Sequence, residues 1–112
     1  MTKLTIKLPT VTGDNKYIDY EFAFSENSLV AAHKHSIFNY DEIMASDKCG
    51  CFYCLRIFTP NKIDEWLKEI SSTNAKSGDT AFCICGLDTV IGSASGFPIT
   101  RVFLQDMHIR WF

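Results

Sequence analysis

Five cysteines confined to two short windows constrain this chain more than any other feature of its sequence. The windows are CGCFYC at residues 49–54 and CICG at residues 83–86. An odd number of cysteines cannot all pair as intramolecular disulfides, and the N-terminus MTKLTIKLPTVTGDNK lacks the apolar stretch of a secretory signal. We therefore expect reduced thiols and a cytoplasmic protein. Two tight cysteine clusters separated by about thirty residues are typical of thiolates that converge on one metal ion.

The spacing inside each window indicates which sulfurs bind the ion. In the first window, two cysteines three positions apart can be aimed at one point by a tight turn. In the second window, two cysteines two positions apart project to the same face of an extended segment. Four thiolates favour tetrahedral Zn²⁺. The expected zinc ligands are Cys51, Cys54, Cys83 and Cys85.

Other ligand sets and other uses of the cysteines remain open at this point. Cys49, His33 or His35 could replace Cys85, although two histidines two positions apart on a helix point about 200° apart and could not share an ion. The clusters could also be reduced, partly buried thiols without a metal. The hypothesis of a thiol–disulfide switch has less support, because such a switch needs an activated thiolate at a helix N-terminus. The residues LRIF after Cys54 favour a strand instead.

The length of 112 residues fits a single domain, which we expect to span residues 1–112. Apolar residues alternate over residues 4–8 and 18–24, on either side of the turn signal VTGDNK, and predict an N-terminal β-hairpin with one buried face. Two short helices should follow. Ser28 is the expected N-cap of the first, and Asn39 with Glu42 resembles a capping box for the second.

The second half of the chain predicts a helix after each cysteine cluster. Thr59-Pro60 should begin the first helix, because Ile63, Trp66, Leu67 and Ile70 recur at helical spacing. Pro98 should begin the last helix, and one face of this helix, apolar at its centre, should carry Ile99, Val102, Phe103, Asp106, Met107 and Arg110. Strands are expected at LRIF, TAFC and Thr89-Val90-Ile91. The expected fold class is α+β: an N-terminal β-hairpin plus a zinc-ribbon or zinc-knuckle-like core with an amphipathic helix after each cluster.

Four stretches of the chain carry distinctive motifs: CGCFYCLRIF, the segment with Glu65-Trp66, TAFCICGLDTVIGSASGFPIT and MHIRWF, which cover roughly residues 33–112. In these stretches the chain resembles a family of small bacterial cytoplasmic proteins. Family members carry the motifs CFYC and CPxCGxDSVIG, and the resemblance implies a zinc-ribbon-like fold. The chain departs from the family at Cys83-Ile84-Cys85, where the members have C-P-x-C.

Charge and composition argue against several classes of function and do not point to a particular one. The net charge is −2 and no basic run occurs, which argues against nucleic-acid binding. No apolar run approaches the roughly 18 residues of a membrane span. GSASG at residues 92–96 could cradle an anion, but it lacks the lysine of a phosphate-binding loop and is better interpreted as a plain loop.

Three functional hypotheses follow from the cysteines, the charge and the aromatic content. The first is a non-enzymatic zinc-binding module that binds another protein, since nine Phe, four Tyr and two Trp exceed what a small core needs. The second is an immunity protein that neutralises a bacterial toxin, because an acidic surface complements a cationic nuclease site. The third is a zinc-dependent hydrolase or nuclease that uses His33, His35 or His108 beside an open metal site.

Overall fold

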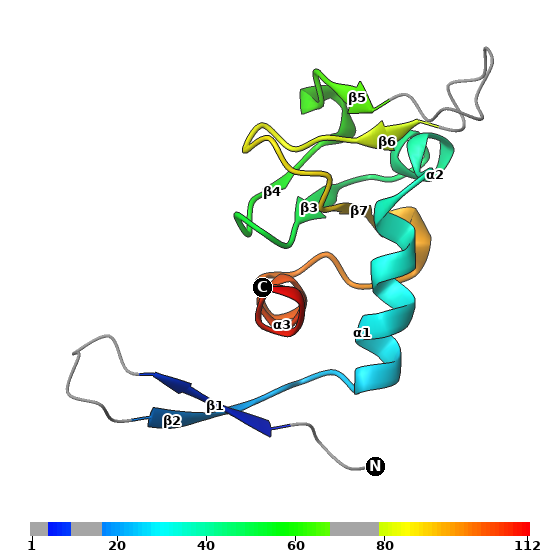
Figure 1. Ribbon diagram of the computed structural model, residues 1–112. Helices are drawn as coiled ribbons and strands as arrows, with labels where there is room; N and C mark the ends of the chain where they lie inside the picture. Colours follow the sequence, from blue (N-terminus) through cyan, green and yellow to red (C-terminus); the bar gives the residue numbers. More distant parts are fainter. Residues whose placement is uncertain (1–4, 10–16, 68–78) are drawn as a thin grey trace.

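The computed structural model describes residues 5–9, 17–67 and 79–112. It combines short helices with three small antiparallel sheets in this part of the chain, so the α+β prediction is confirmed. Figure 1 shows the order of the layers: the N-terminal hairpin at one end, the helices α1 and α3 next to it, and the cysteine-bearing strands beyond them.

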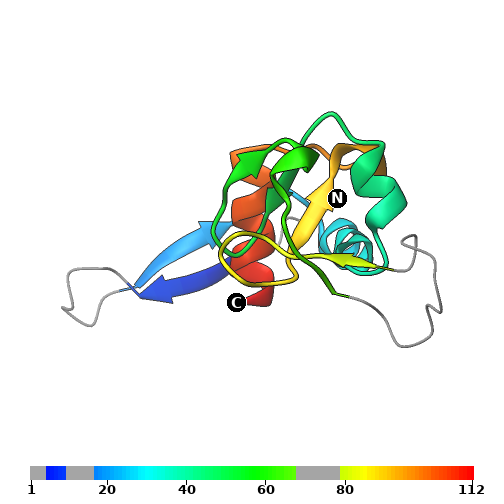
Figure 2. The ribbon, with the colours of Figure 1, turned by 90° about the horizontal axis from the view of Figure 1, so that it is seen from above.

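The N-terminal hairpin forms as predicted from the alternating apolar residues. β1 (Thr5–Pro9) pairs antiparallel with β2 (Tyr17–Glu21), with Ile6 opposite Tyr20. The predicted turn at residues 11–16 and the side chains of residues 5–19 lie outside what the structure describes. Seen from above in Figure 2, the hairpin extends away from the rest of the molecule.

The first helix begins three residues earlier than the sequence predicts. α1 (Glu26–His33) is capped by Ser25, whose hydroxyl accepts a hydrogen bond from the backbone N–H of Ser28. The prediction of Ser28 as the N-cap is therefore wrong. Ser25 has the extended backbone that a cap requires, because the chain arrives from β2. The helix continues into a 3₁₀ turn, η1 (Lys34–Ser36).

The second short helix, α2 (Tyr40–Met44), forms without the predicted capping box. The Asn39 side chain does not cap it. Instead its amide donates to the carbonyl of Val90 and accepts from the N–H of Ala81, each in a different strand. Glu42 contacts His35. Buried backbone groups of the two strands need partners, and this need outweighs local capping.

Two small sheets carry the cysteines. β3 (Cys49–Cys51) lies between β4 (Ile57–Phe58) and β7 (Val90–Gly92), and both pairings are antiparallel. β5 (Trp66–Leu67) pairs with β6 (Thr80–Ala81). The strands predicted at LRIF and TAFC thus exist only in part, because tight turns at the cysteines take up the remaining residues.

The helix predicted after the first cysteine cluster is wrong. Thr59-Pro60 opens only a 3₁₀ turn, η2 (Pro60–Lys62), after which Ile63 is extended and Trp66 enters β5. The backbone hydrogen bonds between β5 and β6 therefore outweigh the helical preference of this segment. The helical spacing of apolar residues gives only a weak preference when a partner strand lies alongside. Ile70 lies outside the described residues.

The helix predicted after the second cluster is present. α3 (Arg101–Trp111) starts at Arg101 rather than at Pro98, and the hydroxyl of its N-cap Thr100 accepts from the N–H of Phe103. Val102 is 54% exposed and does not belong to the buried face. Between Gly92 and Gly96 the chain forms another 3₁₀ turn, η4 (Ser93–Ser95).

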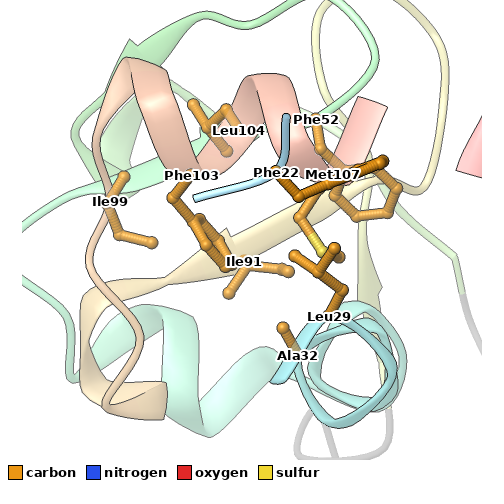
Figure 3. Close-up of a cluster of buried hydrophobic side chains, with 9 residues drawn as sticks. All are labelled: Phe22, Leu29, Ala32, Phe52, Ile91, Ile99, Phe103, Leu104 and Met107. Carbon is orange, nitrogen blue, oxygen red and sulfur yellow. The ribbon is translucent and has the colours of Figure 1, made fainter. Parts of the chain in front are cut away.

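The main core fills the space between α1, α3 and the three-stranded sheet (Figure 3). Its buried side chains come from both helices, from β7, and from the segments that follow β2, follow β3 and precede α3: Phe22, Leu29, Ala32, Phe52, Ile91, Ile99, Phe103, Leu104 and Met107. A second buried cluster surrounds the cysteines and contains Ile43, Cys49, Cys51, Ile63, Ala81, Cys83 and Val90. Among the described residues, no helix has the length and apolar content needed to cross a membrane.

Candidate metal centre

The first cysteine window forms a tight turn between β3 and β4. The N–H of Leu55 donates to the carbonyl of Cys51, and Leu55 takes a left-handed backbone conformation with φ of 66° that reverses the chain. Inside the turn, the N–H groups of Tyr53 and Cys54 both point at the Cys51 sulfur, at 3.4 Å each. Two backbone donors aimed at one sulfur favour its thiolate form.

The second window forms a similar turn between β6 and β7, so the extended segment predicted for Cys83 and Cys85 is wrong, because Gly86 lets the chain reverse directly after Cys85. The N–H of Gly86 donates to the carbonyl of Cys83 at 2.8 Å, and the N–H of Cys83 donates to the carbonyl of Leu87 at 2.9 Å. Gly86 has φ of 95°, a conformation that side-chain-bearing residues rarely adopt. Gly86 therefore allows the turn that begins at Cys83 to close directly after Cys85.

The two turns bring four sulfurs to one point. The Cys51 and Cys85 sulfurs lie 3.7 Å apart, and the Cys54 and Cys83 sulfurs lie 3.5 Å apart. All four sulfurs lie within 4.8 Å of one another. The four thiols that the spacing predicted as ligands are therefore gathered from both windows, including Cys85 of the shortened second motif.

This geometry fits a four-thiolate metal ion. Sulfurs at the corners of a tetrahedron around Zn²⁺, with Zn–S of about 2.3 Å, are separated by about 3.8 Å. The separations of 3.7 Å and 3.5 Å between the sulfurs of the two pairs are within a few tenths of an ångström of that value. Small side-chain rotations would therefore suffice to close the polyhedron around an ion.

The environment of the Cys51 sulfur favours a thiolate. Burial acts to raise the pKa of this thiol, but hydrogen bonds from the N–H of Cys54 and from the hydroxyl of Thr89 outweigh it, so the pKa lies below its ordinary value. The Thr89 oxygen is 2.9 Å from the sulfur. No local sequence pattern indicates this role for Thr89, because Thr89 is 38 residues from Cys51 along the chain and a threonine is typical of any strand.

In the absence of an ion, the protonated form is favoured at two neighbouring thiols, Cys83 and Cys85. Burial, reinforced by the negative charge of Cys51, raises the pKa values of Cys83 and Cys85. Several thiols packed together cannot all ionise unless a cation offsets their mutual repulsion. A bound divalent ion supplies that positive charge and deprotonates coordinating thiols.

The candidates that could have replaced Cys85 lie elsewhere. Among the described residues, the four-sulfur group excludes Cys49, His33 and His35. The Cys49 thiol is buried and contacts the carbonyl of Phe58 at 3.5 Å, and burial raises its pKa to about 12. Cys49 is therefore an inert core residue.

Each of the three histidines has a partner other than the sulfurs. His33 stacks on Trp111 with ring centroids 4.1 Å apart. The Nδ1 atom of His35 lies 2.9 Å from a carboxylate oxygen of Glu42. The Nδ1 atom of His108 lies 3.1 Å from the carbonyl oxygen of Phe52. These contacts give the histidines roles in packing and in joining elements.

No protein-family model, curated protein or solved structure matches the chain. The resemblance to the bacterial proteins with CFYC and CPxCGxDSVIG motifs therefore stays a prediction. The chemistry of the site is argued from its own geometry.

Proposed function

We propose that this protein is a small zinc-binding module with a zinc-ribbon-like core, and that it binds another protein rather than catalysing a reaction. The proposal depends on one observation, the convergence of four cysteine sulfurs from two distant turns within 4.8 Å. Free thiols in such a centre suit a reducing compartment such as the cytoplasm.

The donor set supports zinc and a structural role for it. Four soft thiolate ligands in tetrahedral arrangement are typical of structural zinc sites. Here the ion would join the turn between β3 and β4 to the turn between β6 and β7. Because the unfolded chain has no preformed site, the free energy of metal binding adds to the stability of the fold.

The same donor set argues against the hydrolase or nuclease hypothesis. A catalytic zinc keeps one position for water and needs a general base nearby. Four thiolates leave no such position in a tetrahedral site, and the three histidines considered as bases have the other partners described above.

Exposed aromatic side chains next to the first turn support the interaction role. Tyr53 lies between two expected zinc ligands and is 45% exposed, and Phe112 is 59% exposed. Their ring centroids lie 4.9 Å apart, with His108 against both rings. Aromatic side chains are enriched at protein interfaces. A bound ion would fix the turn and so preorganise Tyr53 for a protein partner, of which a neutralised toxin is one case.

Metal content tests the first part of the proposal. Wild-type protein, Cys51→Ser and Cys49→Ser are purified without chelators and analysed by elemental mass spectrometry. The two cysteines form a matched pair, since both are buried in β3 and only two positions apart. We expect one zinc per chain in the wild type and in Cys49→Ser, and loss of the metal in Cys51→Ser. Equal zinc in the wild type and Cys51→Ser would refute the ligand assignment.

Partner capture tests the second part. The double variant Tyr53→Ser with Phe112→Ser should retain its zinc and lose proteins that co-purify with the wild type from native lysate. Val102→Ser is the control, because Val102 is equally exposed but is not part of this aromatic cluster. Unchanged co-purification with the double variant contradicts the assignment of this surface.

A further inference from the structure

The outer strand of the three-stranded sheet contains a residue whose backbone groups point away from the sheet. β4 lies at the edge of this sheet, beside β3 (Figure 1). Gly50 is opposite Ile57, and in the next pair the N–H of Cys51 donates to the carbonyl of Arg56. Hydrogen-bonded and non-hydrogen-bonded pairs alternate along an antiparallel ladder, so the N–H and C=O of Ile57 point away from β3. In the described part of the chain, neither group has a hydrogen-bond partner.

A hollow of about 320 Å³ borders this edge. Its lining residues come from β4 and the residue before it, from η2 and from the turn of the second cysteine window: Arg56, Ile57, Phe58, Lys62, Cys83 and Ile84. Ile57 is 44% exposed and Ile84 is 68% exposed, so the apolar part of the wall is accessible. The volume is at the lower end of the range for binding pockets and suits the side chains of a peptide.

Two cations line this hollow, and no described acidic residue pairs with them. Arg56 and Lys62 are both exposed, and neither forms an ion pair with another described residue. Asp64 and Glu65 line a separate hollow, which shares Ile84 with this one. The charge at the hollow beside β4 therefore favours a ligand that carries carboxylates.

The same cations decide which kind of chain can add to the edge. An exposed edge strand pairs with other strands unless charged side chains oppose the pairing. If two copies of this protein paired through Ile57 about a two-fold axis, Arg56 of both copies would lie on the same face of the joined sheet, and like charges would repel. A segment of another protein with acidic side chains is attracted instead.

We propose that β4 binds an extended segment of another protein as an added strand. The N–H and C=O of Ile57 exchange hydrogen bonds with one residue of the segment. The residues before and after it share a face of the added strand, and they place an apolar and an acidic side chain at the hollow. The inference extends the proposed interaction role to a surface separate from Tyr53 and Phe112, so either surface can fail its test while the other stands.

A synthetic peptide of this chemistry is the probe. ¹⁵N-labelled protein, as purified, is titrated with acetyl-TELVET-amide, and the amide signal of Ile57 is followed by NMR. We expect a saturable shift of this signal and slower hydrogen exchange of the N–H, because the peptide backbone covers it. The same peptide with N-methyl groups on its leucine and valine cannot donate from those positions and should cause no saturable shift. Equal shifts from both peptides, or no saturable shift at millimolar acetyl-TELVET-amide, would overturn the proposal.

The charges are tested on both molecules. The neutral peptide acetyl-TQLVQT-amide should bind the wild type about fivefold more weakly than the acidic peptide. The double variant Arg56→Gln with Lys62→Gln should bind both peptides equally. Lys34→Gln with Arg101→Gln is the matched control, because it removes the same two charges at exposed positions outside the hollow, and it should keep the preference for the acidic peptide.

A preference that survives in the folded double variant at the hollow contradicts the role of these cations. If that variant fails to fold, the two peptides on the wild type decide, and equal affinities overturn the proposal. Tyr53→Ser with Phe112→Ser should bind the acidic peptide like the wild type, and loss of binding there would assign the peptide to the aromatic cluster instead. A shift of the Ile57 signal on dilution of the protein without peptide would assign β4 to a second copy of this chain and also overturn the proposal.

Discussion

Asp106 joins the N-terminal hairpin to the C-terminal helix, and its removal should destabilise the fold. Its carboxylate, 1% exposed on α3, accepts three hydrogen bonds from β2 and the segment that follows it. The donors are the Tyr20 hydroxyl at 2.6 Å, the Ala23 N–H at 2.8 Å and the Phe24 N–H at 2.9 Å. Burial together with the hydrogen bond to Asp106 raises the pKa of Tyr20, so this hydroxyl remains a donor across the physiological range.

The expected loss in the free energy of unfolding depends on how many hydrogen-bond donors a substitution leaves without an acceptor. A hydrogen bond to a charged group contributes about 1.5–3 kcal/mol. In Asp106→Ala, three donors lose their acceptor, but Tyr20 is half-buried and Ala23 is exposed, so water recovers part of the loss. We therefore expect Asp106→Ala to lower the free energy of unfolding by about 3–5 kcal/mol. In Asp106→Asn the amide oxygen can still accept from the backbone, and the amide can donate to the Tyr20 oxygen, so the expected loss is about 1–2 kcal/mol.

Urea denaturation at fixed zinc concentration, followed by circular dichroism, measures these values. Tyr20→Phe removes only one donor and should cost about 1–1.5 kcal/mol. Because the Tyr20 hydroxyl has no acceptor once Asp106 is alanine, adding Tyr20→Phe to Asp106→Ala should cost much less than it does alone. An Asp106→Ala protein within 0.5 kcal/mol of wild type, or fully additive effects in the double variant, would refute the reasoning (a threshold set by the roughly 0.5 kcal/mol scatter of neutral surface changes).

Two further substitutions probe the metal centre and the sheet. Thr89→Val removes the hydroxyl beside the Cys51 sulfur, and we expect it to weaken zinc binding about tenfold in competition with a chromophoric chelator. Thr89→Ser keeps a hydroxyl and should bind zinc about as tightly as the wild type. Equal zinc affinities for all three proteins would contradict a role of the hydroxyl. Gly92→Ala places a methyl group against Ser46 and 3.1 Å from the Ile43 side chain. The Ser46 hydroxyl cannot move away easily, because it donates to the Glu42 carbonyl and accepts from the Ala94 N–H. This overpacking should destabilise the protein by about 1–3 kcal/mol in thermal or urea denaturation. Gly96→Asn should destabilise it less, because asparagine tolerates the left-handed conformation of Gly96 and the space around this position is open.

The hairpin and the first cysteine turn could be predicted because their signals are local. Alternation of apolar residues specifies a strand, and two cysteines three positions apart favour a tight turn, whatever lies around them. The segment after Pro60 could not be predicted in this way. Its apolar spacing matches a helix, and the outcome depends on β6, a partner strand distant along the chain.

The capping residues show the same division. Asn39 followed by Glu42 satisfies the local pattern of a capping box, yet Asn39 instead bonds the backbone of Val90 and Ala81. Which bond forms depends on whether buried backbone groups nearby need a partner, and this is known only once the strands are in place. Ser25 and Ser28 are likewise equivalent by composition and are distinguished by where the chain leaves β2.

By itself, the sequence determined that four thiols would be presented in two short windows and that a tight turn would present the first pair, because bond geometry over a few residues controls such a turn. The tertiary structure decided that the two turns face each other, that Cys85 rather than Cys49 or a histidine joins the group, and that Thr89 contacts the Cys51 sulfur. It also placed Arg56, Lys62 and Ile84 around one hollow. These outcomes depend on strand pairing and burial between segments far apart in the chain, and no local pattern encodes them.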